Sequence, residues 1–536
     1  MSQLGVGLQT LQHVQRLPLA VKILAVPVVC LLLWRFIRFT VLPILRPNAP
    51  KELPHWFPSH NWSYLGILQR SNKVVEKGIN YTNRNREPFA LPILGRTFYV
   101  ITAPKDVTAV YKASTVLAFT SFLNEALHAF GVDDSSLKLA WHTPAPGDAC
   151  WRDDNPVNPK QKPFIHWIKD IYRQQLLPGE KMNVMVHRFR QYVDTKLQWE
   201  SISSFDLHPA EKNGSVRLSL KDFARKIMLE AITDSLFGTC LMKVEPNLIK
   251  YVDEFNDDAW QLVHRYPKRF ASRVYSNRAK LLATLDKYRQ LPQEERTAGG
   301  EAWAVKTLID EQDILGMSNE SNNAFLMLIH WAADSNASWL CFWLLSYLLW
   351  DKHTLARIRA EIAPAWKEGQ LDVAYLLSSC PLLDSCFFET LRLGGGTVSV
   401  RTVMEPTTIG GKELQTGNDV LILHRSLHFN KNVWGDSPGR FDPERFVKNK
   451  KLSTNAAYVP FGGGNTYCPG RVIIRQEIYI FLALLFDRVD IELDPGQKFP
   501  KLDDTQPSIG VAGPRPDMDL FVTVRAREAS VAVAGK

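Results

Sequence analysis

Cys468 is the residue whose setting most directly indicates chemistry. It lies in YVPFGGGNTYCPGRVIIRQ (458–476), where three glycines at 462–464 precede it and Pro469 follows it. Glycines let the backbone approach a flat, bulky group closely, and proline fits the first turn of a helix. We therefore expect a turn up to Cys468 and an apolar helix over residues 472–486.

The start of a helix is a favourable place for a thiolate, because free backbone N–H groups and the helix dipole stabilise negative charge there. A thiolate is a strong axial ligand for haem iron and favours O–O cleavage. The alternative is a buried, unreactive cysteine in a glycine-rich turn. The chain has seven cysteines without C-x-x-C spacing, which indicates neither a disulfide framework nor a zinc site.

Two further segments carry charged residues at informative spacing. In SCFFETLRLGGG (385–396), Glu389 and Arg392 lie three residues apart and can pair on one helix face. In WGDSPGRFDPERF (434–446), Arg445 lies in a turn-rich loop. A lone Glu–Arg pair is usually a surface ion pair of little energetic value, but three such segments in this order are hard to attribute to chance.

Taken together, these segments make the chain resemble the cytochrome P450 superfamily over nearly its whole length. Phe461, Gly464, Cys468 and Gly470 match the haem-loop pattern F-x-x-G-x-x-x-C-x-G. The resemblance implies a mainly α fold with small β-sheets, in a single haem domain. It also implies that these four residues bind haem b (iron protoporphyrin IX), with Cys468 as the axial iron ligand.

The resemblance also implies roles for the other charged residues. Glu389 and Arg392 match the E-x-x-R pair, and Arg445 matches the arginine of the P-E-R-F segment. In the family these residues form a buried network that supports the haem-binding core. Arg401, in VSVRTVMEP (398–406), resembles the arginine that pairs with a haem propionate. A surface arginine at a strand edge is the alternative.

Thr466 is a departure from the family pattern, because many relatives carry Arg or His two positions before the cysteine. One charge-assisted contact to a propionate is therefore missing, and Arg401 and a residue in 163–175 must supply more. The candidates are three basic residues at helical spacing: His166, Lys169 and Arg173. The sequence does not choose among them.

A second departure lies in WAADSNAS (331–338), where the family usually has A/G-G-x-D/E-T. With the alanines at 332–333 in the small positions, Ser335 takes the acid slot and Asn336 the alcohol slot. Shifting by one makes Asp334 the acid and Ser335 the alcohol, but it puts Trp331 where a small residue is needed. We prefer the first register, and we name Asp334, Ser335 and Asn336 as catalytic candidates for proton delivery.

An amide in the alcohol slot, with the N-T-x-C-P-G-R haem loop, is similar to the sterol 7α-hydroxylase and prostacyclin synthase branch. That branch contains oxygenases and an isomerase. The leading hypothesis is a monooxygenase that oxidises a lipophilic small molecule (terpenoid, steroid or polyketide-like), in the style of fungal secondary metabolism. The alternative is a haem-thiolate isomerase or dehydratase that acts on an oxygenated substrate without a reductase.

A serine hydrolase is a third class, because GDSPG (435–439) formally matches G-x-S-x-G. That motif needs a strand before it and a helix after it. Here the proline and the following GRFDPERF indicate a loop, so the match carries little weight.

Several longer elements must position these residues. The segment 88–104 alternates and contains Gly95, which predicts a hairpin, and residues 219–238 predict a helix that ends at Gly238. Residues 322–350 are apolar on nearly every face. Their mid-stretch polar residues would be costly in lipid, so a buried core helix is favoured over a second membrane span. Residues 397–400 and 506–518 resemble the family's cavity-lining segments.

The N-terminal residues 17–34 form an apolar run with Lys22 as its one charge, at the short limit for a spanning helix. No small-residue cleavage site follows, which favours an uncleaved anchor over a signal peptide. Basic residues gather after the run: Arg35, Arg38, Arg46 and Lys51. The positive-inside rule then predicts a single-pass protein of the endoplasmic reticulum with a cytosolic catalytic domain.

We expect three parts: an anchor and its flank over 1–46, a proline-rich hinge over 47–58 and the haem domain over 59–536. The net charge is +9 without a dense basic run, so nucleic acid is a poor candidate partner. The sequence lacks a GxGxxG pattern and room for a flavin domain. We therefore expect electrons from NADPH-cytochrome P450 reductase, docked on a basic face, and a monomeric protein.

Overall fold

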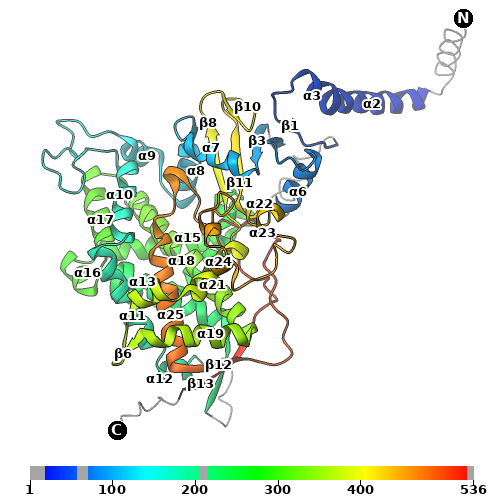
Figure 1. The fold of residues 1–536 in the computed structure, drawn as a ribbon. Coiled ribbons are helices and arrows are strands. Elements are labelled where there is room, and N and C mark those ends of the chain that lie inside the picture. Colours follow the sequence, from blue (N-terminus) through cyan, green and yellow to red (C-terminus); the bar gives the residue numbers. More distant parts are fainter. Residues whose placement is uncertain (1–18, 57–70, 94, 206–213, 528–536) are drawn as a thin grey trace, which may run out of the picture. The chain divides into compact units, whose positions relative to one another are not determined.

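The structure, a computed structural model, describes residues 19–56, 71–93, 95–205 and 214–527. The chain, drawn as a ribbon in Figure 1, divides by its internal contacts into two compact units. Unit 1 comprises Met1–Leu117 and Thr402–Ile422, and unit 2 comprises Ala118–Arg401 and Leu423–Lys536. Because these units join segments that are distant in sequence, they do not test the expected division into anchor, hinge and haem domain, which stays a prediction.

Unit 1 is built around a β-hairpin. Strands β2 (Phe89–Ile93) and β3 (Arg96–Ile101) pair antiparallel, which confirms the hairpin predicted for 88–104. Strand β1 (Lys51–Glu52) lies parallel to β2, and β11 (Asp419–Leu423) lies parallel to β3. A second hairpin in this unit pairs β9 (Thr407–Ile409) with β10 (Lys412–Leu414).

Unit 1 also contains a helix that is long and apolar enough to cross a membrane, and among the described residues Ala25–Leu45 is the one such candidate. It combines α2 (Leu19–Phe36), a π-helical turn (Ile37–Val41) and α3 (Leu42–Leu45). This helix fits membrane anchoring. It extends beyond the predicted run, whose residues 17 and 18 lie outside the described part.

Two arginines fall inside this apolar helix and are engaged by the segment that follows it. Arg38 pairs with Glu52 at 2.8 Å, and the Arg35 guanidinium lies 4.3 Å from the centroid of the Trp56 ring. Arg35 also donates to the His55 carbonyl. A charge in a membrane segment is costly unless it is paired, so these contacts explain how the apolar helix continues past both arginines.

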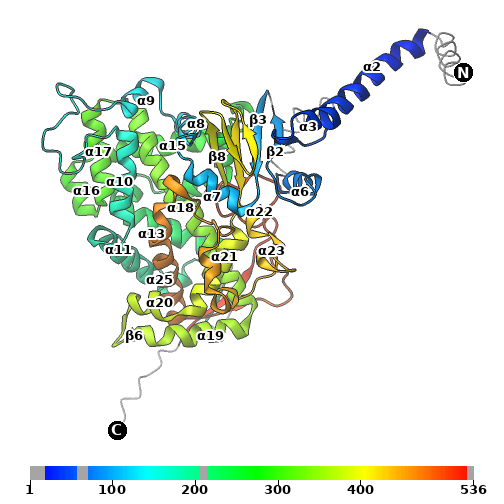
Figure 2. The ribbon, with the colours of Figure 1, turned by 45° about the horizontal axis from the view of Figure 1, so that its top comes forward.

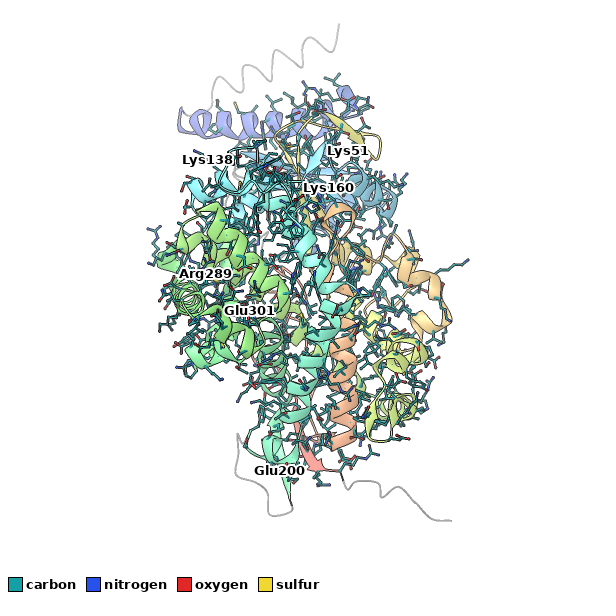
Figure 3. All side chains as sticks on the ribbon, turned by 90° about the vertical axis from the view of Figure 1, so that its left-hand side faces the viewer. Lys51, Lys138, Lys160, Glu200, Arg289 and Glu301 are labelled. Carbon is teal, nitrogen blue, oxygen red and sulfur yellow. The ribbon has the colours of Figure 1, made fainter. Side chains whose placement is uncertain are left out.

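Unit 2 is mainly helical, as predicted. Its long helices include α10 (Phe164–Leu176), α11 (Glu180–Lys196), α13 (Leu220–Val244), α14 (Leu248–Val263), α15 (Ser272–Arg289), α18 (Asn319–Trp350), α21 (Pro381–Gly394) and α25 (Ile473–Arg488). Helix α18 packs against α13 and α15 (Figure 2). Figure 3 shows α11 beside α25, with Lys160 marking the loop that leads into α10. A three-stranded sheet, in the order β12 (Val489–Leu493), β13 (Phe521–Ala526) and β5 (Ser215–Ser219), completes this unit.

Helix α18 is the 32-residue core helix predicted for 322–350, and most of its side chains are buried inside unit 2. Helix α13 breaks at Gly238, where the predicted helix ends, and a second helical stretch follows. Gly238 has a left-handed φ of 67°, and a Cβ there would lie 2.4 Å from the Gly299 carbonyl oxygen. The predicted helix end at Gly238 is therefore confirmed, and the stretch from there to Val244, with Cys240 and Leu241 buried, is a second run of helical turns.

Candidate active site

The loop that carries Cys468 ends in two short 3₁₀ turns, Gly464–Thr466 and Pro469–Arg471, and α25 begins at Ile473. The amide of Cys468 donates to the Phe461 carbonyl at 3.1 Å, which closes the loop. The predicted turn-then-helix is therefore confirmed, with the helix bounds shifted to Ile473–Arg488.

The backbone conformation requires glycine at two positions of this loop. Gly462 and Gly464 have φ values of 73° and 64°, in the left-handed region that residues with a Cβ rarely adopt. Gly463, between them, has an extended backbone with φ −171°. The glycine of the haem-loop pattern at 464 is thus explained by backbone geometry.

The sulfur of Cys468 is half-buried at the head of this turn. Burial raises the pKa of its thiol, whereas hydrogen bonds from the backbone amides of Gly470 and Arg471 act to lower it. These donors stabilise a thiolate once a cation such as iron is present to compensate for the burial. A soft, reachable sulfur with backbone donors is the donor set that haem iron accepts.

Glu389, Arg392 and Arg445 come together in unit 2. Arg392 Nε and Nη2 donate to the two carboxylate oxygens of Glu389 at 2.8 and 2.7 Å, and both side chains are fully buried. Arg445 Nε donates to Glu389 Oε1 at 3.0 Å, and the amide of Asp442 reaches the same oxygen at 3.2 Å. The carboxylate therefore accepts from two guanidinium groups and one backbone amide.

His428 extends this network towards the cysteine loop and was not singled out from the sequence. Arg392 Nη1 donates to the His428 carbonyl at 2.7 Å, and the amide of Val459 donates to His428 Nε2 at 3.1 Å. Burial lowers the pKa of His428 well below its usual range, so the ring is neutral and Nε2 can accept. The segment HRSLHFN (424–430) has two histidines four residues apart, but they match no motif, which is why sequence reasoning missed His428.

Arg401 is buried rather than exposed at a strand edge. It lies in β8 (Val398–Val403), and its Nη2 donates to Thr466 Oγ1 at 2.5 Å while Nη1 donates to the Val400 carbonyl at 2.7 Å. Its guanidinium also lies 5.4 Å from the centroid of the Phe119 ring. The threonine that replaces a cation in the haem loop is thus in direct contact with a cation from β8.

Of the three basic candidates on α10, Lys169 is the one that shares the surroundings of Arg401. Its pKa is lowered by burial first and then by the positive charges of Arg173 and Arg401. His166 is exposed and packs its ring edge-on against Trp141, at a centroid distance of 5.1 Å. Arg173 is exposed at 57% of its side chain. Helix α10 also packs on the Pro469–Arg471 turn.

The polar notch of α18, residues 331–338, has side chains that point in two directions. Asp334 is fully buried, accepts from Asn256 Nδ2 at 3.2 Å and has His330 Nε2 at 3.3 Å from its Oδ2. Ser335 and Asn336 are half-buried, and Asn336 Oδ1 accepts from the Val511 amide at 2.8 Å. The carboxyl at 334 thus faces α14, whereas the amide at 336 faces the C-terminal segment.

The same stretch of α18 presents small side chains to accessible space. Ala332 is exposed and Ala333 half-buried, although residues 322–327 on one side and 340–345 on the other are buried. Residues 397–400 and 508–511 are also half-buried. An accessible alanine in the middle of a core helix is what a large flat cofactor or its substrate would need there, so this region fits a haem.

The segment 435–439 does not form a nucleophile elbow. Gly435 follows a helical turn, α23 (Lys431–Trp434), rather than a strand. The Pro438 carbonyl accepts from Arg392 Nη1 at 2.7 Å, so this loop belongs to the arginine network. The strand and helix that a serine hydrolase requires around its nucleophile are not formed by these residues.

A family model described as cytochrome P450 matches residues 176–520, which is well over half of the chain. This span includes Glu389, Arg401, Arg445 and Cys468. The chain belongs to the cytochrome P450 family.

Three relatives illustrate the similarity. The cytochrome P450 monooxygenase poxD of Penicillium oxalicum is 25% identical over 469 residues, which cover 85% of this chain and 89% of the relative. The monooxygenase calL of Penicillium decumbens is 23% identical over 550 residues, covering 92% and 97%. The cholesterol 7-alpha-monooxygenase of Cricetulus griseus is 25% identical over 347 residues, covering 59% and 68%.

Family membership, together with several relatives named as monooxygenases, indicates that this protein is a cytochrome P450 monooxygenase. P450 enzymes hold a haem through a cysteine thiolate, and they generally take electrons from a redox partner and act on lipophilic substrates. The predicted recognition and enzyme class are therefore confirmed, and similarity to a cholesterol 7-alpha-monooxygenase agrees with the expected branch.

Proposed function

We propose that this P450 is a haem-thiolate monooxygenase in which Cys468 is the axial iron ligand. The observation that carries the proposal is the half-buried Cys468 at the start of the Pro469–Arg471 turn that precedes α25, with the amides of Gly470 and Arg471 directed at its sulfur. Phe461 closes the loop through its carbonyl, and Gly464 supplies the left-handed turn. When bound, the haem supplies dioxygen activation and transfer of one oxygen atom to the substrate.

Arg401 and Lys169 are the residues we propose to hold the carboxylates of the haem. The pKa of Lys169 is lowered by burial first and then by the positive charges of Arg173 and Arg401, so Lys169 and Arg401 repel each other. An anionic group between them would relieve that repulsion. Glu389, Arg392 and Arg445 act at a distance, because they fix the segments that precede the cysteine loop.

Ser335 and Asn336 are the residues we propose to act in proton delivery, in the register that places Ser335 in the acid slot. Asp334 faces Asn256 and His330, so its proposed role is to hold α18 against α14. Neither Ser335 nor Asn336 can release a proton as an acid does. They can orient a water molecule or a hydroxyl, and bulk solvent must then supply the proton.

The substrate we propose is a lipophilic small molecule of terpenoid, steroid or polyketide type. The residues at 397–400 and 508–511 are small, half-buried and without charge, which supports this class. The similarity to Penicillium monooxygenases supports a role in fungal secondary metabolism. We further propose a monomer anchored in the endoplasmic reticulum, with a cytosolic catalytic domain that receives electrons from NADPH-cytochrome P450 reductase.

The test of the iron ligand is a reduced carbon monoxide difference spectrum. The full-length protein should give the thiolate-type Soret band, and Cys468→Ser should lose it. Cys341→Ser is the matched control, because Cys341 is buried in α18 and should keep the band. A Cys468→Ser variant that retained the thiolate-type band would refute the assignment.

An isomerase or dehydratase that needs no reductase is the second candidate. It is favoured by the Asn336 carboxamide, whose oxygen accepts from Val511 and so does not resemble the usual alcohol of the slot. Incubating the reconstituted protein with candidate substrates, with and without NADPH, reductase and oxygen, separates the two functions. Turnover of a lipid peroxide without these three components would overturn the monooxygenase.

A further inference from the structure

The turn at residues 508–514 is fixed on two sides within unit 2. On one side, the backbone of 394–396 exchanges two hydrogen bonds with Gly510 and Ala512, at 2.9 and 3.1 Å. On the other side, Trp343 Nε1 of α18 donates to the Ala512 carbonyl at 2.7 Å. The turn is therefore part of a packed layer and does not hang free beside α18.

Asn336 makes a third attachment, and its direction is set by chemistry. The Val511 amide can only donate, so the atom that meets it at 2.8 Å must be the carboxamide oxygen Oδ1. The other end of the carboxamide, Nδ2, then faces Ser335 Oγ at 3.4 Å and donates to it. Both ends of the Asn336 side chain are thus engaged.

Gly510 makes this attachment possible. A Cβ built on Gly510 would lie 1.7 Å from Asn336 Oδ1 and 2.7 Å from its carboxamide carbon. Both atoms belong to the short and restricted end of an Asn side chain, which cannot move aside without breaking the bond to Val511. Any residue other than glycine at 510 therefore displaces Asn336.

The bonds form a directed chain that ends at Ser335. The Val511 amide donates to Asn336, and Asn336 donates to Ser335, so each bond polarises the next. Because Ser335 Oγ accepts from Asn336, its own hydrogen must point elsewhere. Ser338 behaves differently, since its hydroxyl donates back to the Asp334 carbonyl at 3.4 Å.

We propose that Asn336 is a positioning residue that latches the 508–514 turn to α18 through Val511, and that it orients Ser335 as the hydroxyl donor of the notch. Gly510 is then the residue that determines whether the latch can close. The latch stands on the contacts alone. The part played by Ser335 rests on the proposed haem-thiolate function, so the two parts need separate measurements.

Amide hydrogen exchange of the haem-loaded, full-length protein tests the latch directly. Asn336→Leu removes the acceptor, and we expect exchange in peptides covering 506–514 to rise about fivefold, the effect of losing one buried hydrogen bond. Gly510→Ala should give the same rise, and Asn336→Asp, which keeps an acceptor oxygen, should not. Gly179→Ala is the control, because its Cβ would meet nothing closer than 3.9 Å. Unchanged exchange in Asn336→Leu would overturn the latch.

Two iron-binding probes of different size give a second readout. Imidazole needs only the iron, so its spectral affinity should be the same in all variants. Clotrimazole is bulky enough to contact a displaced turn, and its affinity should change about fivefold in Asn336→Leu and Gly510→Ala alone. Equal clotrimazole affinities in the wild type and Asn336→Leu would contradict a positioning role.

The role of Ser335 is tested by hydrogen peroxide released per NADPH consumed with added reductase. If Asn336 acts through Ser335, the double variant Ser335→Ala/Asn336→Leu should release the same fraction as Ser335→Ala alone. Additive effects would refute the coupling. Loss of the thiolate-type carbon monoxide spectrum in the wild type would remove the haem-thiolate function and this coupling with it, but the exchange experiment would still decide the latch.

Discussion

Two buried carboxyl groups in unit 2 have opposite surroundings. Glu389 in α21 accepts hydrogen bonds from Arg392 and Arg445, with distances of 2.7 to 3.0 Å. Asp334 in α18 accepts from the Asn256 carboxamide at 3.2 Å and lies 3.3 Å from a histidine ring nitrogen. Both side chains are fully buried. One carboxyl group is thus held by cations and the other by neutral groups.

The surroundings of Asp334 show how burial favours the neutral form of an acid. Burial raises the pKa of Asp334 well above its usual range, and burial lowers the pKa of neighbouring His330 to about 4. Arg225, the cation whose charge acts on Asp334, is engaged by Asp253 and Asp257 on α14. An isolated buried charge is too costly, so Asp334 and His330 are both neutral, whereas Glu389 is in contact with two guanidinium groups.

Breaking the charged network should have the largest effect. Glu389→Gln leaves Arg392 buried without its carboxylate, and we expect a loss of about 3–5 kcal/mol in the free energy of unfolding. Thermal unfolding of the purified protein measures it. Glu444→Gln is the matched control, because its ion pair with Arg357 is exposed and worth little. Equal stability losses in the two variants would contradict a buried network.

Changing the geometry of the Arg445 side chain while keeping its positive charge should lower the free energy of unfolding by less. Arg445→Lys keeps a cation beside Glu389 but loses the bond from Nη1 to the Trp434 carbonyl at 3.0 Å. We expect a loss of about 1–3 kcal/mol, since a buried carbonyl is left without its donor. Chemical denaturation measures it against Arg357→Lys, whose exposed guanidinium should tolerate the change. A null effect in Arg445→Lys would show that only its charge matters.

The two carboxyl groups also differ in how far the sequence predicts them. Glu389 and Arg392 are three residues apart, so helical spacing alone brings them together. The partner of Asp334 on α14 lies 78 residues away in the chain, and no local pattern links the two. The contact between Asn336 and Val511 spans 175 residues and depends on a missing side chain at Gly510, which is equally invisible in the sequence.

For the fold too, the sequence predicted features that depend on residues close together in the chain. Short-range signals predicted the hairpin at 88–104, the core helix at 322–350 and the helix after Cys468, because alternation and helical periodicity depend on near neighbours. The helix end at Gly238 was predicted as well, but the short helical stretch that continues from it to Val244 was not. The apolar helix beyond residue 34 was missed because its arginines are engaged by Glu52, His55 and Trp56.

The stability contributed by the neutral Asp334 should depend on pH. Because the folded pKa of Asp334 is raised, its contribution to stability is fully present below the ordinary aspartate pKa and is lost as pH rises towards the folded value. Asp334→Asn keeps the shape and cannot ionise. Its stability relative to the wild type should therefore increase from about pH 5 to about pH 8, measured by urea unfolding. A constant deficit across this range would show that Asp334 is ionised.

Glu477 offers the smallest and most selective test of the same principle. It is buried in α25, and burial raises the pKa of its carboxyl to about 8. Because the pKa is raised on folding, as for Asp334, the wild type should lose stability as pH rises from the ordinary glutamate pKa through about 8. Glu477→Gln should raise the melting temperature at about pH 9 and leave it unchanged at about pH 5, unlike exposed Glu492→Gln, which should change neither. If Glu477→Gln instead lowered the melting temperature at high pH, this carboxyl would be paired like Glu389, and burial without a cation would not be enough to keep an acid neutral here.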